Sequence, residues 1–286
     1  MRIVSAAILA SILTSTLTAT MVLTPTATVA ATSTGTHLVE FEKMTWVEVK
    51  TALAAGKTTA LIYTGGVEQR GPQNANGGHN LMAYATVQAI AEKLGNAIFM
   101  PVLPFTPNNA NAELPGTIGI TNDLLAAILE RITEQSITDG FKNVILMGDH
   151  GGGQPVVYQQ VAAKLEGKYA AQGIHVYYCD QVYNPANDAF EAYLAEHGYP
   201  ADLHGGISDT AEMLYLDKDN TWVRRSLLAT AVGDPVVDGK AQIGPNSPHN
   251  GIEGDARRAT RELGKRMFDL KVDYAVKQIR GFTQHP

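Results

Sequence analysis

Four short apolar stretches, separated by segments with helical spacing, constrain the fold of this chain more than any other feature. They are residues 59–63, 97–102, 143–147 and 174–178. Because apolar residues run through each stretch instead of alternating with polar ones, the stretches predict strands buried on both faces. Apolar residues spaced three and four apart predict helices between them, at residues 83–94, 123–138 and 155–171. This order predicts an α/β fold, a three-layer α/β/α sandwich with a mostly parallel central sheet.

The first 31 residues differ from the rest of the chain. Arg2 gives a basic start, residues 3–23 are uncharged and rich in Ala, Ile, Leu, Ser and Thr, and residues 29–31 are small. This pattern is typical of a bacterial secretory signal peptide. A transmembrane anchor is the alternative, since about 20 apolar residues span a bilayer, but the Ser, Thr and Ala content favours cleavage. We therefore expect a signal peptide at residues 1–31, a periplasmic or secreted protein, and no membrane partner after cleavage.

Residues 32–286 predict a single domain, because they contain no internal repeat and no linker of domain-boundary length. Residues 234–254 are rich in Gly, Pro, Asn and Asp and predict a long surface loop before a final helix at residues 255–279. Cys179 is the only cysteine, so no intrachain disulfide can form. Its apolar neighbours predict that the thiol lies in the core.

The charge of the chain limits its partners. The 286 residues carry 22 basic and 28 acidic side chains, a formal net charge of −6, without a Lys/Arg-rich block. A nucleic-acid binder needs a concentrated basic surface. We therefore expect no nucleic-acid partner and a small molecule as the substrate or ligand.

Candidate chemical groups follow the apolar stretches, where the carboxyl ends of parallel strands place ligands. Glu68 and His79 follow the first stretch, His150 follows the third, and Asp209 lies in a later Gly-rich segment. Mixed imidazole and carboxylate ligands suit Zn²⁺, Mn²⁺ or Fe²⁺. Metal-free acid/base chemistry is the alternative from the same residues. No Gly-x-Ser-x-Gly segment occurs, so a covalent serine mechanism has no candidate.

Five motifs in order resemble the creatininase family of metal-dependent amidohydrolases. They are Glu68 with Gly71-Pro72, residues 114–118 (LPGTI), residues 148–153 (GDHGGG), residues 204–210 (HGGISDT), and residues 251–255 (GIEGD) with Ala259-Thr260 and Gly264. The resemblance spans residues 44–279. It implies an α/β sandwich, two divalent metals, hydrolysis of cyclic or linear amides, and a homo-oligomer.

The resemblance also implies roles for single residues. Glu68 and His150 fall on metal ligands, Asp209 falls where the family has a ligand Glu, and His204 falls on a histidine that faces the substrate and can donate a proton. Apart from the resemblance, Asp149, next to His150, or Asp209 is a candidate to orient the water or a ligand histidine. Gln73 and Gly153 replace a family His and Asn, so specificity for creatinine does not carry over.

Two departures fall on the metal site itself. Arg70 stands where the family has a metal-binding His, and His79 stands where it has an Asp that bridges two metals. Arginine stays protonated and cannot bind a metal, and an imidazole binds one ion through one nitrogen. We therefore expect one ion per chain, Zn²⁺ first and Mn²⁺ or Fe²⁺ as alternatives, held by Glu68, His79 and His150 with Asp209 nearby. Arg70 is expected in the place of the second cation, where it can bind a substrate carboxylate or an oxyanion.

Two functions follow from this site. The first is an exported metal-dependent amidohydrolase that cleaves a small cyclic or linear amide by metal-activated water, with His204, Arg70 and Asp149 as catalytic residues. The second is a degenerate family member that binds a small molecule without turnover. The joint presence of Glu68, His150, His204 and an acid at position 209 favours the enzyme.

Overall fold

A parallel sheet of four strands forms the centre of the protein, whose computed structural model describes residues 38–284. The strands are β1 (Thr59–Thr64), β2 (Ala97–Phe99), β3 (Asn143–Gly148) and β4 (His175–Tyr178), in the spatial order β2-β1-β3-β4. All pairs are parallel, and β1 aligns with β3 over its full length. The described residues belong to one compact unit. The predicted signal peptide at residues 1–31 lies outside the described residues.

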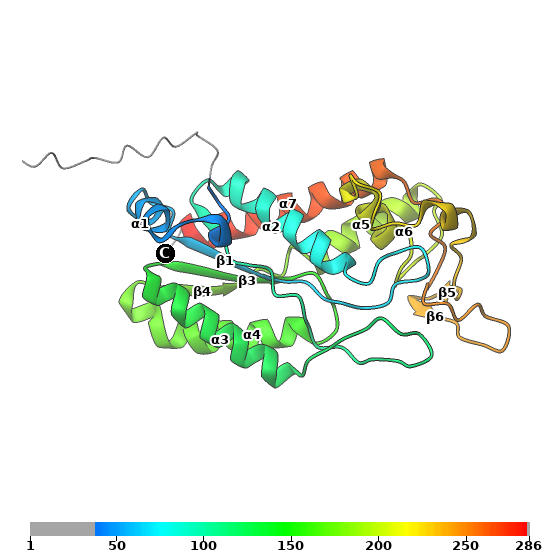
Figure 1. Cartoon of the computed structure of the whole chain (residues 1–286), viewed down its shortest axis with the longest axis horizontal. Helices are drawn as coiled ribbons and strands as arrows, with labels where there is room; N and C mark the ends of the chain where they lie inside the picture. Colours follow the sequence, from blue (N-terminus) through cyan, green and yellow to red (C-terminus); the bar gives the residue numbers. More distant parts are fainter. Residues whose placement is uncertain (1–37, 285–286) are drawn as a thin grey trace, which may run out of the picture. The chain divides into compact units, whose positions relative to one another are not determined.

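Helices cover both faces of the sheet, so the predicted three-layer α/β/α arrangement is confirmed (Figure 1). On one face lie α2 (Gly78–Leu94) and α7 (Arg261–Gln284), and on the other lie α3 (Asn122–Asp139) and α4 (Gln154–Tyr169). The remaining helices are α1 (Trp46–Ala54), α5 (Asn184–Glu196) and α6 (Ile207–Leu216), with 3-10 turns at Phe41–Lys43, Ala170–Gln172 and Arg225–Thr230.

Successive residues of β1 contribute to opposite cores. Leu61 and Tyr63 pack with α2 and α7, whereas Ala60 and Ile62 pack with α3 and α4. Side chains of a strand alternate between the two faces, so both faces of β1 need apolar residues. This explains the continuous apolar pattern. Full burial of each large aliphatic side chain contributes roughly 1.5–3 kcal/mol to stability.

Several predicted boundaries needed correction. The second strand ends at Phe99 instead of residue 102, because Pro101 has no amide hydrogen to continue the sheet. The final helix begins at Arg261, six residues later than expected, and continues to Gln284. The predicted loop at 234–254 contains a short hairpin of β5 (Val236–Val237) and β6 (Lys240–Ala241). Helix α1 was not predicted, although Thr45 and Glu48 form a capping box at its start.

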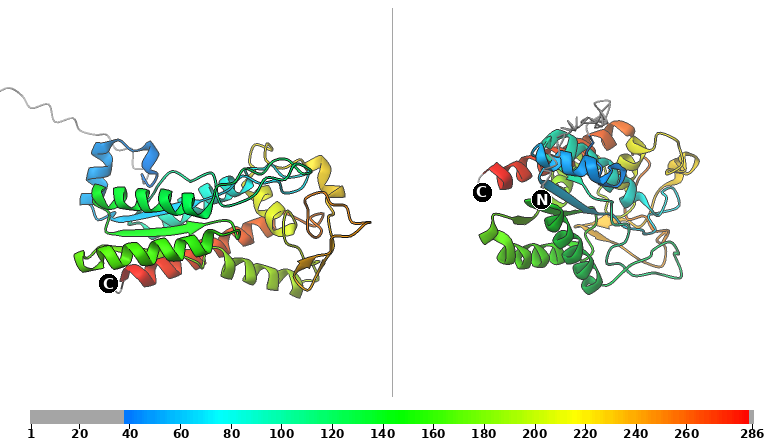
Figure 2. Two further views of the ribbon diagram at one scale, coloured as in Figure 1. Left: turned by 90° about the horizontal axis from the view of Figure 1, so that it is seen from below. Right: turned by 60° about the vertical axis from the view of Figure 1, so that its left-hand side comes forward.

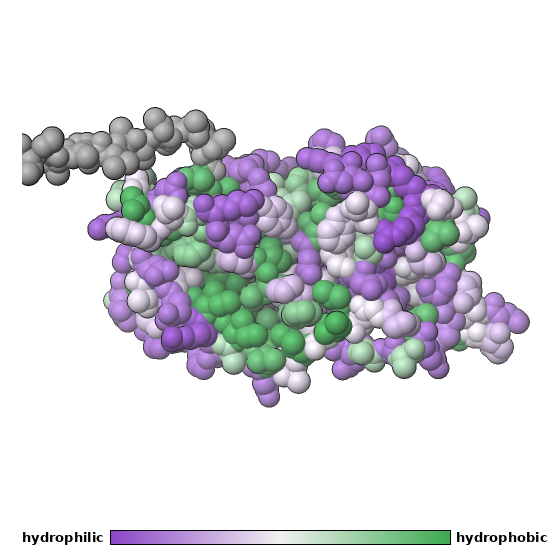
Figure 3. All heavy atoms as spheres, viewed as in Figure 1, coloured by the Kyte–Doolittle hydropathy of each residue, from purple (hydrophilic) through white to green (hydrophobic). Residues whose placement is uncertain are grey.

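The surface and the core show two further features. Cys179 is fully buried and unpaired, as predicted, and burial raises the pKa of its thiol to about 12. Hydrophobic side chains gather on the face over α3 and the segment that leads into it (Figure 3); large exposed residues of this stretch are Phe105, Ile118 and Leu124. Among residues 38–284, no helix has the length and apolar character needed to cross a membrane.

The carboxyl ends of the strands point toward the later part of the chain. Figure 2 (left) shows β3 ending toward the yellow and orange segments, which include α6 and the β5–β6 hairpin. The chain leaves β1 for β2 on one side of the sheet and returns to β3 on the other. Ligands bind at such a change of strand order in open α/β sheets. The loops after β1 and β3 are therefore the place to look for a site.

Candidate metal centre

Three buried side chains meet at this point of the sheet. Glu68 lies four residues after the end of β1, His79 lies in the first turn of α2, and His150 lies two residues after the end of β3. Each is less than a tenth exposed, and their ligand atoms all lie within 4.8 Å of one another. The structure thus brings together the three residues expected to hold the ion.

The Glu68 carboxylate lies between the two imidazoles. Its Oε1 is 2.7 Å from His79 Nε2, and its Oε2 is 2.9 Å from His150 Nε2. The Asn108 side-chain amide donates to Oε2 at 2.6 Å. Burial opposes ionisation of Glu68, but the contacts with His150, His79 and Arg70 hold its pKa well below the usual value. Glu68 is therefore ionised and available as a ligand.

These donors fit one divalent ion. The Nδ1 of His79 lies 3.0 Å from Asp149 Oδ2, so the neutral ring has its proton on Nδ1 and turns the Nε2 lone pair toward Glu68. A lone pair and a carboxylate oxygen at 2.7 Å repel each other unless a cation lies near both, and the Arg70 guanidinium contacts both atoms in this structure. An imidazole that donates its other N–H to a carboxylate is the usual arrangement of a metal-binding histidine.

His150 is set up differently from His79. The amide of Gly152 donates to His150 Nδ1 at 2.9 Å, so the neutral ring has its proton on Nε2 and donates it to Glu68. Binding of an ion at Nε2 requires this nitrogen to lose its proton. Three glycines, Gly151 to Gly153, follow His150 and allow the backbone to adjust.

Arg70 contacts the same cluster from the side that faces away from the pocket. Its Nη2 lies 3.2 Å from Glu68 Oε1 and 2.5 Å from His79 Nε2, and its Nη1 lies 3.3 Å from Asp209 Oδ1. Burial lowers the pKa of Arg70, but Asp209 and Glu68 overcome this effect and raise it. The side chain is fully buried and does not line the pocket. This geometry gives Arg70 no direct contact with a substrate carboxylate or oxyanion, in contrast to the expectation from the sequence.

Asp209 lies apart from the three clustered ligands. Its Oδ1 faces Arg70, and its Oδ2 accepts a hydrogen bond from the amide of Gly205 at 2.8 Å. Burial alone raises the pKa of Asp209, but the positive charge of Arg70 lowers it overall. The predicted ligand set of four is thus divided, with three residues together and Asp209 on the far side of the guanidinium.

His204 faces the cluster from the loop before α6. Its Nε2 is 2.5 Å from the carbonyl oxygen of Gln69, and its Nδ1 is 3.6 Å from Glu68 Oε1. Because a carbonyl oxygen can only accept, the proton of the neutral ring lies on Nε2. A quarter of the side chain is exposed, and it lines the pocket. His204 can therefore exchange a proton with a bound molecule through Nδ1.

A second buried cation supports the cluster through Asp149. Lys271, from α7, donates to Asp149 Oδ1 at 2.6 Å and to Glu212 Oε2 at 2.7 Å. All three side chains are almost completely buried. Burial raises the pKa of both acids, but Lys271 and His79 lower that of Asp149, whereas that of Glu212 stays raised.

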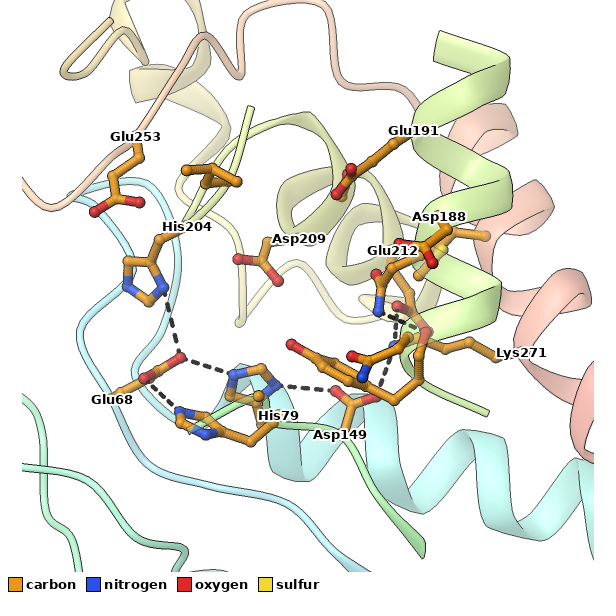
Figure 4. A pocket seen from close by; sticks show the side chains of 18 residues that line it. Glu68, His79, Asp149, Asp188, Glu191, His204, Asp209, Glu212, Glu253 and Lys271 are labelled. Carbon is orange, nitrogen blue, oxygen red and sulfur yellow. Dashed lines mark hydrogen bonds and ion pairs between the residues drawn. The ribbon is translucent and has the colours of Figure 1, made fainter. Parts of the chain in front are cut away.

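The cluster forms the floor of a pocket of about 560 Å³ (Figure 4). His204 and Asp209 also line it, and α5 contributes Asn184, Asn187, Asp188 and Glu191. Of the proposed site residues, the pocket exposes Glu68, His79, Asp149, His150, His204 and Asp209 to a ligand, but not Arg70.

Sequence reasoning missed three residues of this site. Asn108 lies in a loop between β2 and α3, Glu212 lies within α6, and Lys271 lies within α7. Lys271 is one of several lysines on a helix that otherwise alternates charged and apolar residues, so nothing in the sequence distinguishes it. The spacing of Asp209 and Glu212, three residues apart on one helix, was the only available signal, because it places both on the same face.

Comparisons with known proteins identify the family and the fold. The creatininase family model, described as creatinine amidohydrolase, matches residues 42–279. The creatinine amidohydrolase of Pseudomonas putida is 24% identical over 249 residues, which cover 83% of this chain and 95% of that protein. A crystal structure of creatinine amidohydrolase superposes with a TM-score of 0.68 at 22% identity, over 86% of this chain and 98% of that one.

A more distant structure has the same fold. A putative creatinine amidohydrolase from Bacteroides fragilis matches with a TM-score of 0.59 and 19% identity, over 88% of this chain and 98% of that chain. Two other matched structures are described as creatininase Mn and as a mutant creatininase of the Zn-Zn type. The family model covers most of the chain, and the predicted resemblance is confirmed: this chain belongs to the creatininase family of amidohydrolases.

Proposed function

We propose that this protein hydrolyses the C–N bond of a small cyclic or linear amide with the help of a divalent ion. The observation that carries the proposal is the buried cluster of Glu68, His79 and His150 at the floor of a pocket. The relatives named creatinine amidohydrolase support amide hydrolysis as the reaction. Creatinine itself is not proposed as the substrate, because Arg70, Gln73 and Gly153 replace family residues.

Glu68, His79 and His150 would hold the ion. A divalent ion in such a site lowers the pKa of a bound water to about 7, which makes hydroxide available at neutral pH. Zn²⁺ is the first choice and Mn²⁺ or Fe²⁺ the alternatives, since the ligands are mixed nitrogen and oxygen donors. Relatives described with Mn and with Zn support this range.

His204 moves the proton in this proposal. His204 lines the pocket, and its Nδ1, which carries the lone pair of the neutral ring, lies 3.6 Å from Glu68 Oε1. It can therefore take a proton from the attacking water and give it to the leaving nitrogen. The water oxygen bonds to the carbonyl carbon, the C–N bond breaks, and the nitrogen leaves with that proton. Asp149 holds the Nδ1–H of His79 and thereby keeps Nε2 directed at Glu68.

We propose one ion per chain instead of two. The Arg70 guanidinium lies between Asp209 on one side and Glu68 and His79 on the other, where a second cation would have to lie. Metal analysis of the purified protein is expected to find one ion per chain. The double variant Arg70→His with His79→Asp restores the family residues and is expected to bind a second ion. Two tightly bound ions in the unmodified protein would contradict the proposal.

Hydrolysis is tested with a panel of small cyclic and linear amides, read by release of ammonia or amine. The metal-loaded protein is expected to turn over at least one of them, and the chelated protein none. The alternative function is a small-molecule binder without turnover. Tight binding of an amide by the metal-loaded protein, with no product after long incubation, would favour that alternative.

We further propose that the protein is exported and that it forms a homo-oligomer. The leader at residues 1–31 supports export to the periplasm or medium. The hydrophobic face over α3 and the segment that leads into it supports self-association, since such patches on soluble proteins often mark interfaces (Figure 3). Amino-terminal sequencing of the exported protein tests export, and the first residue is expected to follow residue 31.

Light scattering tests self-association, and a monomer in solution would contradict the proposed homo-oligomer.

A further inference from the structure

The hydroxyl of Tyr183 lies in the pocket without a hydrogen-bond partner. Tyr183 directly precedes α5, and its side chain lines the pocket together with Glu68 and His150. The polar side chains of the metal cluster bind one another, but the Tyr183 hydroxyl makes no hydrogen bond within residues 38–284. Because a hydroxyl can both donate and accept, this group is available to a molecule in the pocket.

The tyrosine ring lies against the glycine loop that follows His150. A Cβ added at Gly151 would lie 3.5 Å from both the hydroxyl oxygen and Cε1 of Tyr183. The charges of Asp149 and Asp209 act on the same hydroxyl, and both acids line the pocket near the metal cluster (Figure 4). The hydroxyl therefore lies beside the residues that would hold the ion.

Packing and backbone hydrogen bonds fix the ring in this place. The ring packs against the core cluster that β1 forms with α2 and α7. The Tyr183 carbonyl oxygen accepts hydrogen bonds from the backbone amide and the side-chain amide of Asn187, both at 2.9 Å. A donor that is held in position before the reaction needs little reorganisation when negative charge develops on a substrate.

The Tyr183 hydroxyl keeps its proton at neutral pH. Burial raises the pKa of Tyr183 well above its usual value, and the negative charges of Asp149 and Asp209 raise it further. Tyr183 can therefore act as a hydrogen-bond donor, whereas the raised pKa opposes a role as a general base.

Other donors near the cluster are bound or out of reach. Arg70 does not line the pocket, and Lys271 is bound by two acids. The Nε2–H of His204 is directed at a backbone carbonyl oxygen, and the Ser208 hydroxyl is buried. When water attacks an amide, negative charge develops on the carbonyl oxygen, and a hydrogen-bond donor at that oxygen stabilises the transition state. Tyr183 can fill the oxyanion role that the sequence suggested for Arg70.

We propose that Tyr183 is a catalytic residue whose hydroxyl donates a hydrogen bond to the carbonyl oxygen of the amide. This inference rests on the proposed function and adds a residue to its site. As the water oxygen bonds to the carbonyl carbon, an electron pair of the C=O bond moves onto the carbonyl oxygen, and the hydrogen bond strengthens. The tyrosine proton is not transferred. The C=O bond forms again as the C–N bond breaks, and the leaving nitrogen takes its proton from His204.

Tyr183→Phe tests this role, because it removes the hydroxyl and keeps the ring. On the amide that the metal-loaded protein hydrolyses fastest, kcat is expected to fall about a hundredfold. KM should change by less than about threefold, since the hydrogen bond is strongest in the transition state. Bound metal and the free energy of unfolding should not change. Tyr193→Phe is the matched control, since Tyr193 lies on α5 outside the pocket.

Acetohydroxamate tests the hydrogen bond without turnover. This amide analogue carries an ionisable oxygen next to its carbonyl and is titrated calorimetrically into the metal-loaded protein. Tyr183→Phe is expected to bind it about tenfold more weakly than the unmodified protein, and Tyr193→Phe equally well.

Unchanged kcat and unchanged acetohydroxamate affinity in Tyr183→Phe would overturn the inference. Equal losses in Tyr193→Phe, or a loss of bound metal as large as the loss of kcat, would also overturn it. Weaker acetohydroxamate binding by Tyr183→Phe, in a protein that hydrolyses no amide, would support Tyr183 as the donor and count against the proposed hydrolysis.

Discussion

The pocket has two sets of carboxylates that differ in their partners. The inner wall, around the metal cluster, contributes Glu68, Asp149, Asp209 and Glu212, and the outer wall contributes Asp188, Glu191 and Glu253. On the inner wall, each acid touches a histidine, a buried Arg or a buried Lys at hydrogen-bond distance. On the outer wall, Asp188, Glu191 and Glu253 have no basic partner among residues 38–284. The inner carboxylates are therefore held in place by their partners, whereas the outer carboxylates are not held by an ion pair within the described residues.

Burial explains why the two walls must differ. A charge that is removed from water costs several kcal/mol unless a partner compensates it. Asp149, Glu212 and Lys271 are each at most 2% exposed, so they are stable only as a group. Asp188 and Glu191 lie where water can still reach them, so they tolerate the lack of a partner.

Loss of a metal ligand from the inner wall should have the largest effect. His150→Ala is expected to reduce amide hydrolysis by at least about a thousandfold, because it removes one of three ligands of the ion that activates water. Turnover and bound metal are measured together. His197→Ala, at the exposed end of α5, is the control and should change neither. Unchanged turnover in His150→Ala would contradict the assignment of the metal centre.

Removal of the buried lysine should break the charge balance of the inner wall. Lys271→Met leaves Asp149 and Glu212 buried without their cation, and the free energy of unfolding is expected to fall by about 3–5 kcal/mol. Chemical denaturation measures this value. Lys265→Met is the control on the same helix, since its exposed pair with Asp269 is screened by water and should contribute little to stability. If both variants lose the same small amount of unfolding free energy, the stability of the buried acids of the inner wall does not depend on Lys271.

The sheet was predictable from the sequence because burial on both faces leaves a continuous apolar pattern. Residues 59–63 and 143–147 were expected as strands, and the structure extends each by one residue. The end of β2 was less certain, since the apolar pattern continues through Pro101 although the hydrogen bonding does not. Strand ends depend on pairing partners, which one stretch of sequence does not specify.

The sequence carries a local signal for only part of the candidate site. Glu68 and His150 lie in the loops after β1 and β3 and in family motifs, and the structure places both in the metal cluster. Lys271 was missed because its partners, Asp149 and Glu212, are 122 and 59 residues away in the sequence. The inward direction of Arg70 was also not predictable, because only the fold determines whether a guanidinium faces a pocket or a buried carboxylate.

Asp202 is a buried acid outside both walls that has no cation beside it within residues 38–284 to compensate its charge, so its effect on stability should depend on pH. Burial raises the pKa of Asp202 to about 7, and the charges of Asp209 and Glu191 add to this effect. Between about pH 4 and pH 7 the folded protein keeps a proton that the unfolded chain has released, so stability falls as the pH rises through this range. The total loss is expected to be about 4 kcal/mol, since one pKa unit corresponds to about 1.4 kcal/mol.

Asp202→Asn should remove this part of the pH dependence, since an amide stays neutral and its oxygen can still accept the hydrogen bond from the amide of Ser208. Unfolding free energies are compared at about pH 5 and about pH 8. Asp188→Asn is the contrast, because that carboxylate lies at the exposed outer wall. A pH dependence that is the same in Asp202→Asn and the unmodified protein would show that Asp202 ionises normally.

The smallest expected effect concerns the backbone that supports the inner wall. Gly152 donates its amide hydrogen to His150 Nδ1, and a Cβ at this position would lie 2.6 Å from the Cε1 of that ring. Gly152→Ala should therefore displace the imidazole through the added Cβ and weaken metal affinity by about tenfold, because a ligand ring moved from its position binds the ion less well. Gly167→Ala is the matched control, since nothing lies within 4 Å of its added Cβ in α4. It should leave metal affinity unchanged and stabilise the helix by up to about 1 kcal/mol. Equal metal affinity in Gly152→Ala and Gly167→Ala would show that His150 binds the ion whatever side chain stands at position 152. The hypothesis that Gly152 helps to position His150 would then be wrong.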